Sequence, residues 1–171
     1  MHSRDDDALI VAHAVRAAGV DATIGLFPSV DMPALAAHWT GLTFTLAEAY
    51  DLHLVEPAAS RLPFSVLRDG LITVATDELI PAMRQELPPA LTISTRALTA
   101  VGNGLYLWRY GYLLASLYQT LDSGQSIDLA AQHWPISTLF GAPDAGELLA
   151  FADACRQTAC PPILHPFLSM C

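Results

Sequence analysis

Stretches rich in alanine and leucine, which favour helices, alternate along the chain with shorter apolar runs that are separated by turn residues. The helical stretches carry acidic or hydroxyl residues where a helix would begin, and glycine or proline where one would end. They are residues 8–18, closed by Gly19; a segment that starts near Asp31; residues 77–87, behind Thr76; and the segment that Asp144 opens. This pattern predicts two helices in the first part of the chain, one in its middle and one in its last part.

Two pairs of apolar runs flank dipeptides that are typical of tight turns. FSVLR and LITVA flank Asp69-Gly70, and LTISTRALTAV and LYLWRYGYLL flank Asn103-Gly104. Both dipeptides accept the positive φ angles of a type I′ turn, so each predicts a β-hairpin. Leu105–Tyr112 is then a strand, although one helix over Leu105–Leu121 is an alternative because LLASLYQTL has helical composition. Periodicity also leaves Leu42–Val55 open between strand and helix.

The order of these elements predicts an α+β fold. We expect an antiparallel sheet of four to five strands, built from the two hairpins, with helices packed on one face. A length of 171 residues is enough for one core, so residues 1–171 are expected to form a single domain. Pro161, Pro162 and Pro166 predict an irregular tail over residues 159–171.

The charge of the chain excludes several partners and reactions. Its formal net charge is −9, and all eight basic residues are arginines. A phosphate backbone would be repelled, so nucleic acid is not expected as a partner. Without lysine there is no amine for Schiff-base chemistry and no phosphate-binding lysine of a P-loop. No motif for a cofactor is present, and none is expected.

The apolar content suggests surface that remains for a partner or ligand. Hydrophobic residues make up 53% of the chain and charged residues 15%, which is below the usual charged fraction. The most hydrophobic stretch, Leu105–Leu121, includes Arg109 and four tyrosines and is shorter than the roughly 20 apolar residues that cross a bilayer. We expect no membrane insertion. Asp5, Asp6 and Asp7 are the reverse of the positive start of a secretory signal, so a cytoplasmic protein is expected.

The run of aromatic residues around Arg109 is the densest unusual feature. On a strand, Tyr106, Trp108, Tyr110 and Tyr112 share one face, with Trp108 at its centre and Arg109 on the other face. Tyrosine and tryptophan suit partner interfaces and ligand pockets, and they suit a sheet–helix core equally well. The aromatic face is therefore the first candidate for a binding surface.

These features favour a non-enzymatic accessory or regulatory domain that binds a protein partner, or a second copy of itself, through the aromatic face. No catalytic motif such as G-x-S-x-G is present, which leaves enzymatic activity undecided and disfavoured. The alternative is a small-molecule enzyme or ligand sensor. Its pocket would lie between the aromatic strand and a helix, with Arg109 or Arg96 binding an anionic group.

His133 and Trp134 lie together in a loop-rich stretch and are further candidates for binding, although the tryptophan could equally cover an edge of the core. The residues with the composition of a zinc site are Cys155, Cys160, His165 and Cys171. Their separations exceed the short spacing of a zinc knuckle, and Cys155 belongs to an apolar helix. We therefore expect no bound metal.

Glu48, Asp51 and His53 form a second group with acid–base or metal-binding side chains. On a helix Glu48 and Asp51 share a face, and on a strand Asp51 and His53 do. No single regular conformation gathers all three, so a solvated surface is the preferred interpretation.

Overall fold

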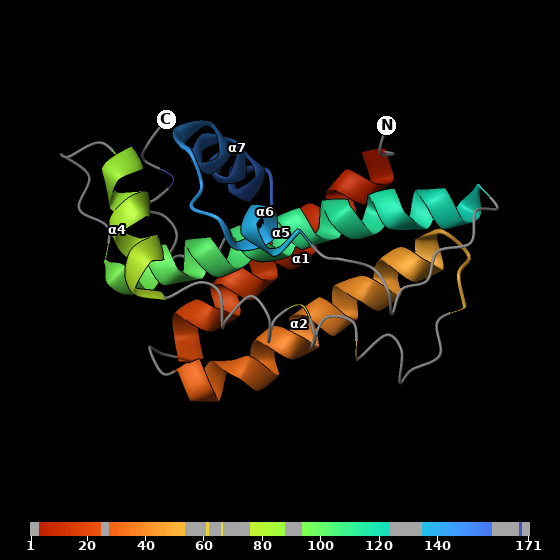
Figure 1. Cartoon of the computed structure of the whole chain (residues 1–171), viewed down its shortest axis with the longest axis horizontal. Helices are drawn as coiled ribbons and strands as arrows, with labels where there is room; N and C mark the ends of the chain where they lie inside the picture. The colour runs from red at the N-terminus through yellow and green to blue at the C-terminus, as the bar shows by residue number, and fades with distance from the viewer. Residues whose placement is uncertain are drawn as a thin grey trace.

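The computed structural model describes residues 4–24, 28–53, 61, 66, 76–87, 94–123, 135–158 and 168, and no strand occurs in these ranges. Its helices are α1 (Arg4–Ile24), α2 (Pro28–Ala49), α4 (Thr76–Glu86), α5 (Thr95–Asp122), α6 (Ile136–Phe140) and α7 (Ala145–Arg156). Figure 1 shows α5 crossing the length of the molecule, with α1 running diagonally behind it, α2 below it and α7 above it. The described part is therefore all-α.

The predicted α+β fold is wrong, and α5 is the reason. Residues 95–122 form one helix that contains both the expected turn at Asn103-Gly104 and the expected strand Leu105–Tyr112. Its first turn is capped by Ser94, whose hydroxyl accepts a hydrogen bond of 3.2 Å from the backbone N–H of Ala97. The other predicted hairpin, at Asp69-Gly70, lies outside the described residues.

The position of α5 explains why its sequence resembles a strand. It packs against α1, α2, α4 and α6, so much of its length is covered on more than one side. A helix that is covered in this way needs no polar face and loses the 3.6-residue alternation of a surface helix. Its aromatic and branched side chains then give the same sequence pattern as a buried strand.

Small residues let α1 come close to α5. A Cβ atom on Gly104 would lie 2.7 Å from Cζ of Phe151, 3.0 Å from Cβ of Ala18 and 3.1 Å from the carbonyl oxygen of Ala14. A Cβ atom on Gly111, seven residues further on, would lie 2.7 Å from Cγ2 of Ile10. Close packing, and not a turn, therefore requires glycine at position 104.

The other helix predictions fare better. The helix expected over 8–18 exists but continues through Gly19, and the segment near Asp31 belongs to α2. The helix expected over 77–87 is α4. The cap at Asp144 is confirmed, because its carboxylate accepts a hydrogen bond of 2.8 Å from the backbone N–H of Glu147 at the start of α7.

The open segment Leu42–Val55 is helical as far as Ala49, where Asp51 ends the helix. Asp51 has a φ of 53°. Its N–H donates to the carbonyl of Glu48 at 3.0 Å, and the N–H of Leu52 donates to that of Ala47 at 2.8 Å. These two bonds form the Schellman motif that commonly closes helices, with aspartate at the position that usually holds glycine.

The core contains a polar network among large aromatic rings. Trp39 stacks on Tyr110 with ring centroids 4.4 Å apart. The hydroxyls of Tyr110 and Thr43 lie 2.9 Å apart, and that of Thr43 also donates to the carbonyl of Trp39 at 2.8 Å. This threonine links α2 to α5 while its own polar atom stays satisfied.

Among the described residues, no helix combines the length and the apolar content that crossing a bilayer requires.

Candidate functional site

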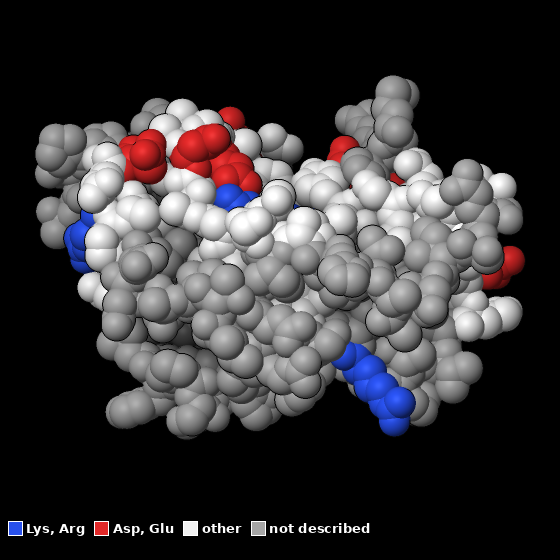
Figure 2. Space-filling model, viewed as in Figure 1, with Lys and Arg blue, Asp and Glu red and all other residues white. Residues whose placement is uncertain are grey.

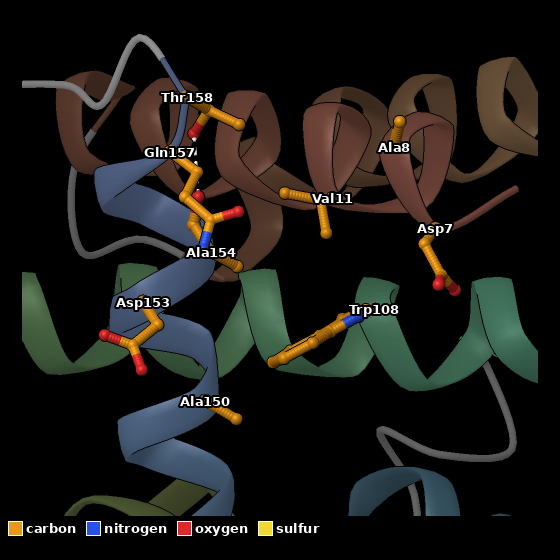
Figure 3. Close-up of a pocket in the computed structure, with 9 residues that line it drawn as sticks. All are labelled: Asp7, Ala8, Val11, Trp108, Ala150, Asp153, Ala154, Gln157 and Thr158. Carbon is orange, nitrogen blue, oxygen red and sulfur yellow. Dashed lines mark hydrogen bonds between the residues drawn. The ribbon is translucent and has the colours of Figure 1, made fainter. Parts of the chain in front are cut away.

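An open groove lies where α1, α5 and α7 meet, and it is the best candidate for a binding site in the described part of the chain. Its volume is about 520 Å³. Figure 3 shows Trp108 projecting from α5 between the lining residues of α1 and those of α7. The lining residues are Asp7, Ala8, Val11, Trp108, Ala150, Asp153, Ala154, Gln157 and Thr158.

Small side chains create the space around Trp108. Ala150 and Ala154 are four residues apart on α7, so they face the same way, and Ala8 lies on α1. Larger residues at these positions would fill the groove. The result is a recess that is lined by one large aromatic ring and by several alanine side chains.

Neighbouring rings hold Trp108 in place. Its ring centroid is 5.4 Å from that of Phe151 on α7 and 6.0 Å from that of Tyr112, one helical turn further along α5. Its indole Nε1 is buried and makes no hydrogen bond of ordinary geometry among the described residues. A buried N–H in this state costs stability, and Trp39 Nε1 and the Tyr106 hydroxyl are in the same state elsewhere among the described residues.

The hydroxyl of Tyr112 connects this ring to Asp7. The pKa of Tyr112 is raised, chiefly by burial. The nearby Trp108 N–H lowers this pKa in part, while the charge of Asp7 and a hydrogen bond to its carboxylate raise it. The approach of the indole to Tyr112 falls short of a regular hydrogen bond. The tyrosine hydroxyl and the Asp7 carboxylate are therefore neighbours beside the groove.

The described lining of the groove has acidic side chains and no basic one. Asp7 and Asp153 contribute carboxylates to its lining, and Figure 3 shows them on opposite sides of Trp108. Asp153 forms an ion pair with Arg156, which also donates to the carbonyl of Leu168 at 2.7 Å. No ion pair among the described residues includes Asp7. Figure 2 shows acidic side chains gathered over the region of α7.

Arg109 joins helices together. Its Nε donates to Glu147 Oε1 at 2.6 Å and its Nη2 to Oε2 at 2.5 Å. Its Nη1 donates to the carbonyls of Leu139 and Gly141 at 3.1 and 2.7 Å. These bonds tie α5 to the end of α6 and the start of α7, and they engage every nitrogen of the guanidinium group. Glu147 therefore turns to Arg109, away from the reciprocal bond of a capping box.

The four residues of the expected aromatic face divide between two sides of α5. Trp108 and Tyr112 lie near the groove, whereas Tyr106 and Tyr110 lie in the core near Phe140 and Trp39. The reason is geometric, because residues two apart share a face on a strand and lie on opposite sides of a helix. Burial raises the pKa of Tyr106 to about 12, and Arg109 partly offsets that effect.

Several predicted site residues are not brought to the groove. Arg96 belongs to α5 by its backbone, and its side chain is not described. His133, Trp134, Cys160, His165 and Cys171 lie outside the described residues. Cys155 is fully buried in the core cluster. Within the described ranges no three histidine, cysteine or acidic side chains gather as a metal site would require.

Sequence reasoning missed most of the groove. The sequence pattern presents Asp7 only as part of an acidic amino-terminal run and the alanines of α7 only as helix-forming residues. The spacing of Ala150 and Ala154 is a usable signal, since small residues four apart lie on the same face of a helix and leave it recessed. That signal gains meaning only when a large side chain from another helix lies opposite.

His13 of α1 and His38 of α2 lie near each other, away from the groove. Cε1 of His13 lies 3.6 Å from the position that a Cβ atom on Gly41 would take, which places its ring against α2, one turn from His38. Burial lowers the pKa of both histidines; Arg16 lowers both further, and His38 also lowers that of His13. Both rings are therefore held toward their neutral forms.

In comparisons with known proteins, no family model, no curated protein and no solved structure matches the chain.

Proposed function

We propose that this protein is a non-enzymatic accessory or regulatory domain that binds a protein partner in the groove between α1, α5 and α7. The observation that carries the proposal is Trp108, a large aromatic side chain among small residues in an open recess. Interfaces are enriched in tryptophan, and a few aromatic anchors at their centre supply most of the binding energy. The groove offers a partner both a ring to pack against and space to enter.

The open form of the recess favours a protein over a small molecule. Drug-sized ligands usually bind in sites that bury most of their surface, whereas this groove is open on one side. A segment of another protein can occupy a recess of this form without being enclosed by it.

The alternative is a small-molecule sensor, and the volume supports it. About 520 Å³ lies within the roughly 300–1,000 Å³ of ordinary ligand sites. An anionic ligand held by Arg109 loses its basis, because Glu147 and two carbonyls already occupy that guanidinium group. A small molecule bound here would have to rely on Trp108 and the polar rim.

Site-specific photo-crosslinking tests the proposal in the full chain. A photoreactive phenylalanine analogue at position 150 lies in the groove, and the same residue at position 145 lies on the same helix outside its lining. We expect position 150 to capture a defined protein that position 145 does not. That protein is then purified and titrated against the wild-type chain.

Binding by the purified partner decides between the alternatives. Ala150→Leu fills the recess and is expected to weaken binding by about tenfold or more, while Ala145→Leu leaves it unchanged. Equal binding by both variants would contradict the groove as the interface. A small molecule retained in native mass spectra of the wild type, and lost in Ala150→Leu, would favour the sensor instead.

A further inference from the structure

The charge of the groove indicates what part of a partner it receives. Among the described residues its lining has two carboxylates and no basic side chain, in a chain whose net charge is −9. Asp153 shares its charge with Arg156, but Asp7 is joined to no arginine among the described residues. The electrostatic potential of the recess therefore favours a positive group, chiefly at the Asp7 end.

Trp108 adds a second preference for a cation. The indole is the best aromatic partner for an ammonium or guanidinium group, which it attracts when the cation lies within about 6 Å of the ring. Figure 3 shows Trp108 beside Asp7, with its ring projecting toward Ala150. A cation over this ring would interact with the aromatic face and with the carboxylate together.

We propose that the groove receives a basic side chain, arginine by preference, from an apolar segment of the protein partner. This inference rests on the proposed function and adds the chemistry of the occupant. A planar guanidinium group can stack on the indole while it donates to Asp7, and the alanine and valine walls fit the apolar residues on either side of it. Arginine thus matches the ring, the charge and the walls.

Tyr112 lies beside both Trp108 and Asp7. Its ring centroid is 6.0 Å from that of Trp108, and its hydroxyl lies near enough to Asp7 for that carboxylate to raise its pKa. Trp108 and the Asp7 carboxylate therefore share Tyr112 as a neighbour.

A pair of peptides that differ only in charge tests the inference. The probes are acetyl-Ala-Leu-Arg-Leu-Ala-amide and the same peptide with citrulline, the neutral isostere of arginine. Binding is followed by the indole N–H resonance of Trp108 in nitrogen-15-labelled full-length protein, identified with Trp108→Phe. We expect the arginine peptide to bind at about millimolar concentration, and the citrulline peptide about fivefold or more weakly. Added salt should weaken only the former.

A matched charge variant separates the local carboxylate from the net charge. Asp7→Asn keeps an acceptor for Tyr112 and is expected to weaken the arginine peptide about threefold or more without changing the citrulline peptide. Asp122→Asn changes the net charge equally but lies outside the groove lining, and it should leave both unchanged. Equal binding of the two peptides, equal effects of the two variants, or no shift with either peptide would each overturn the inference.

The outcomes also distinguish this inference from the proposed function. If both peptides bind equally and Ala150→Leu blocks both, the groove remains a binding site and only the cation is wrong. If position 150 captures no partner while the arginine peptide still binds as expected, the preference for a cation stands and the protein partner does not.

Discussion

Individual polar residues in this protein mostly serve the backbone and the joints between helices. Arg109 satisfies two carbonyls and a carboxylate at the junction of α5, α6 and α7, and Thr43 joins α2 to α5. Asp51, considered from the sequence as an acid or a metal ligand, closes α2. Residue type alone does not separate these roles from chemistry, because the same atoms serve both.

Asp51 provides a test at the scale of the residue. Its φ of 53° is strained for residues with a Cβ atom and free of strain for glycine, so Asp51→Gly is expected to raise the free energy of unfolding by about 0.5–1 kcal/mol. Asp51→Ala should be less stable than Asp51→Gly. Urea unfolding of the three proteins measures the order. If alanine proves as stable as glycine, the left-handed conformation at position 51 is wrong.

At the scale of the element, α5 shows how packing can replace amphipathic patterning. Gly104 and Gly111 allow α1 to approach along one side, while Trp108 and Tyr106 contact rings on other sides. A helix with neighbours on several sides is stabilised by contacts that the linear pattern does not reveal. The dipeptide Asn103-Gly104 forms no turn here, because Gly104 lies in α5 where α1 leaves no room for a Cβ atom.

Substitution of these glycines tests the packing. Alanine normally favours a helix over glycine by about 1 kcal/mol, but at position 104 its methyl group would lie 2.7 Å from Phe151 and 3.1 Å from the backbone of α1. We expect Gly104→Ala to destabilise the protein by about 1–3 kcal/mol through overpacking. Thermal or urea unfolding measures the change.

Gly41 in α2 is the matched control. Its nearest neighbour would be Cε1 of His13 at 3.6 Å, an ordinary contact. Gly41→Ala should therefore stabilise the protein by about 0.5–1 kcal/mol. If both substitutions shift stability in the same direction, close packing is not what places glycine at position 104.

At the scale of the whole molecule, the net charge and the protonation of two histidines have opposite effects on folding stability as the pH falls. With a net charge of −9, mild acidification reduces self-repulsion and favours the folded state. The two half-buried histidines between α1 and α2 oppose this, since burial and Arg16 lower their pKa values in the folded protein. The unfolded chain therefore binds more protons near these sites.

The sign of the histidine effect is testable. Their contribution to stability is complete above the ordinary pKa of 6.5 and is lost as the pH falls from there toward the lowered folded values. We expect a variant with both His13→Gln and His38→Gln to lose less stability than the wild type as the pH falls below that value. Urea unfolding at several pH values compares the two proteins. Identical pH profiles for the wild type and the double variant would refute the idea.

The sequence alone determined the features that depend on local chemistry. The start of α7 follows from the Asp144 side chain, which satisfies a nearby backbone N–H, and the helix expected behind Thr76 is present as α4. The net negative charge, which disfavours nucleic acid as a partner, also follows from the sequence alone, because net charge is a sum over residues and does not depend on the fold.

Only the tertiary structure decided the identity of α5 and the existence of the groove. Leu105–Tyr112 fits a buried strand or a buried helix by its pattern, and the choice depends on the close approach of α1 at Gly104 and Gly111. The groove likewise requires Asp7, Trp108 and Ala150, from three helices far apart in sequence, to meet. Contacts of this kind arise from packing, which a linear pattern of hydrophobic and polar residues does not specify.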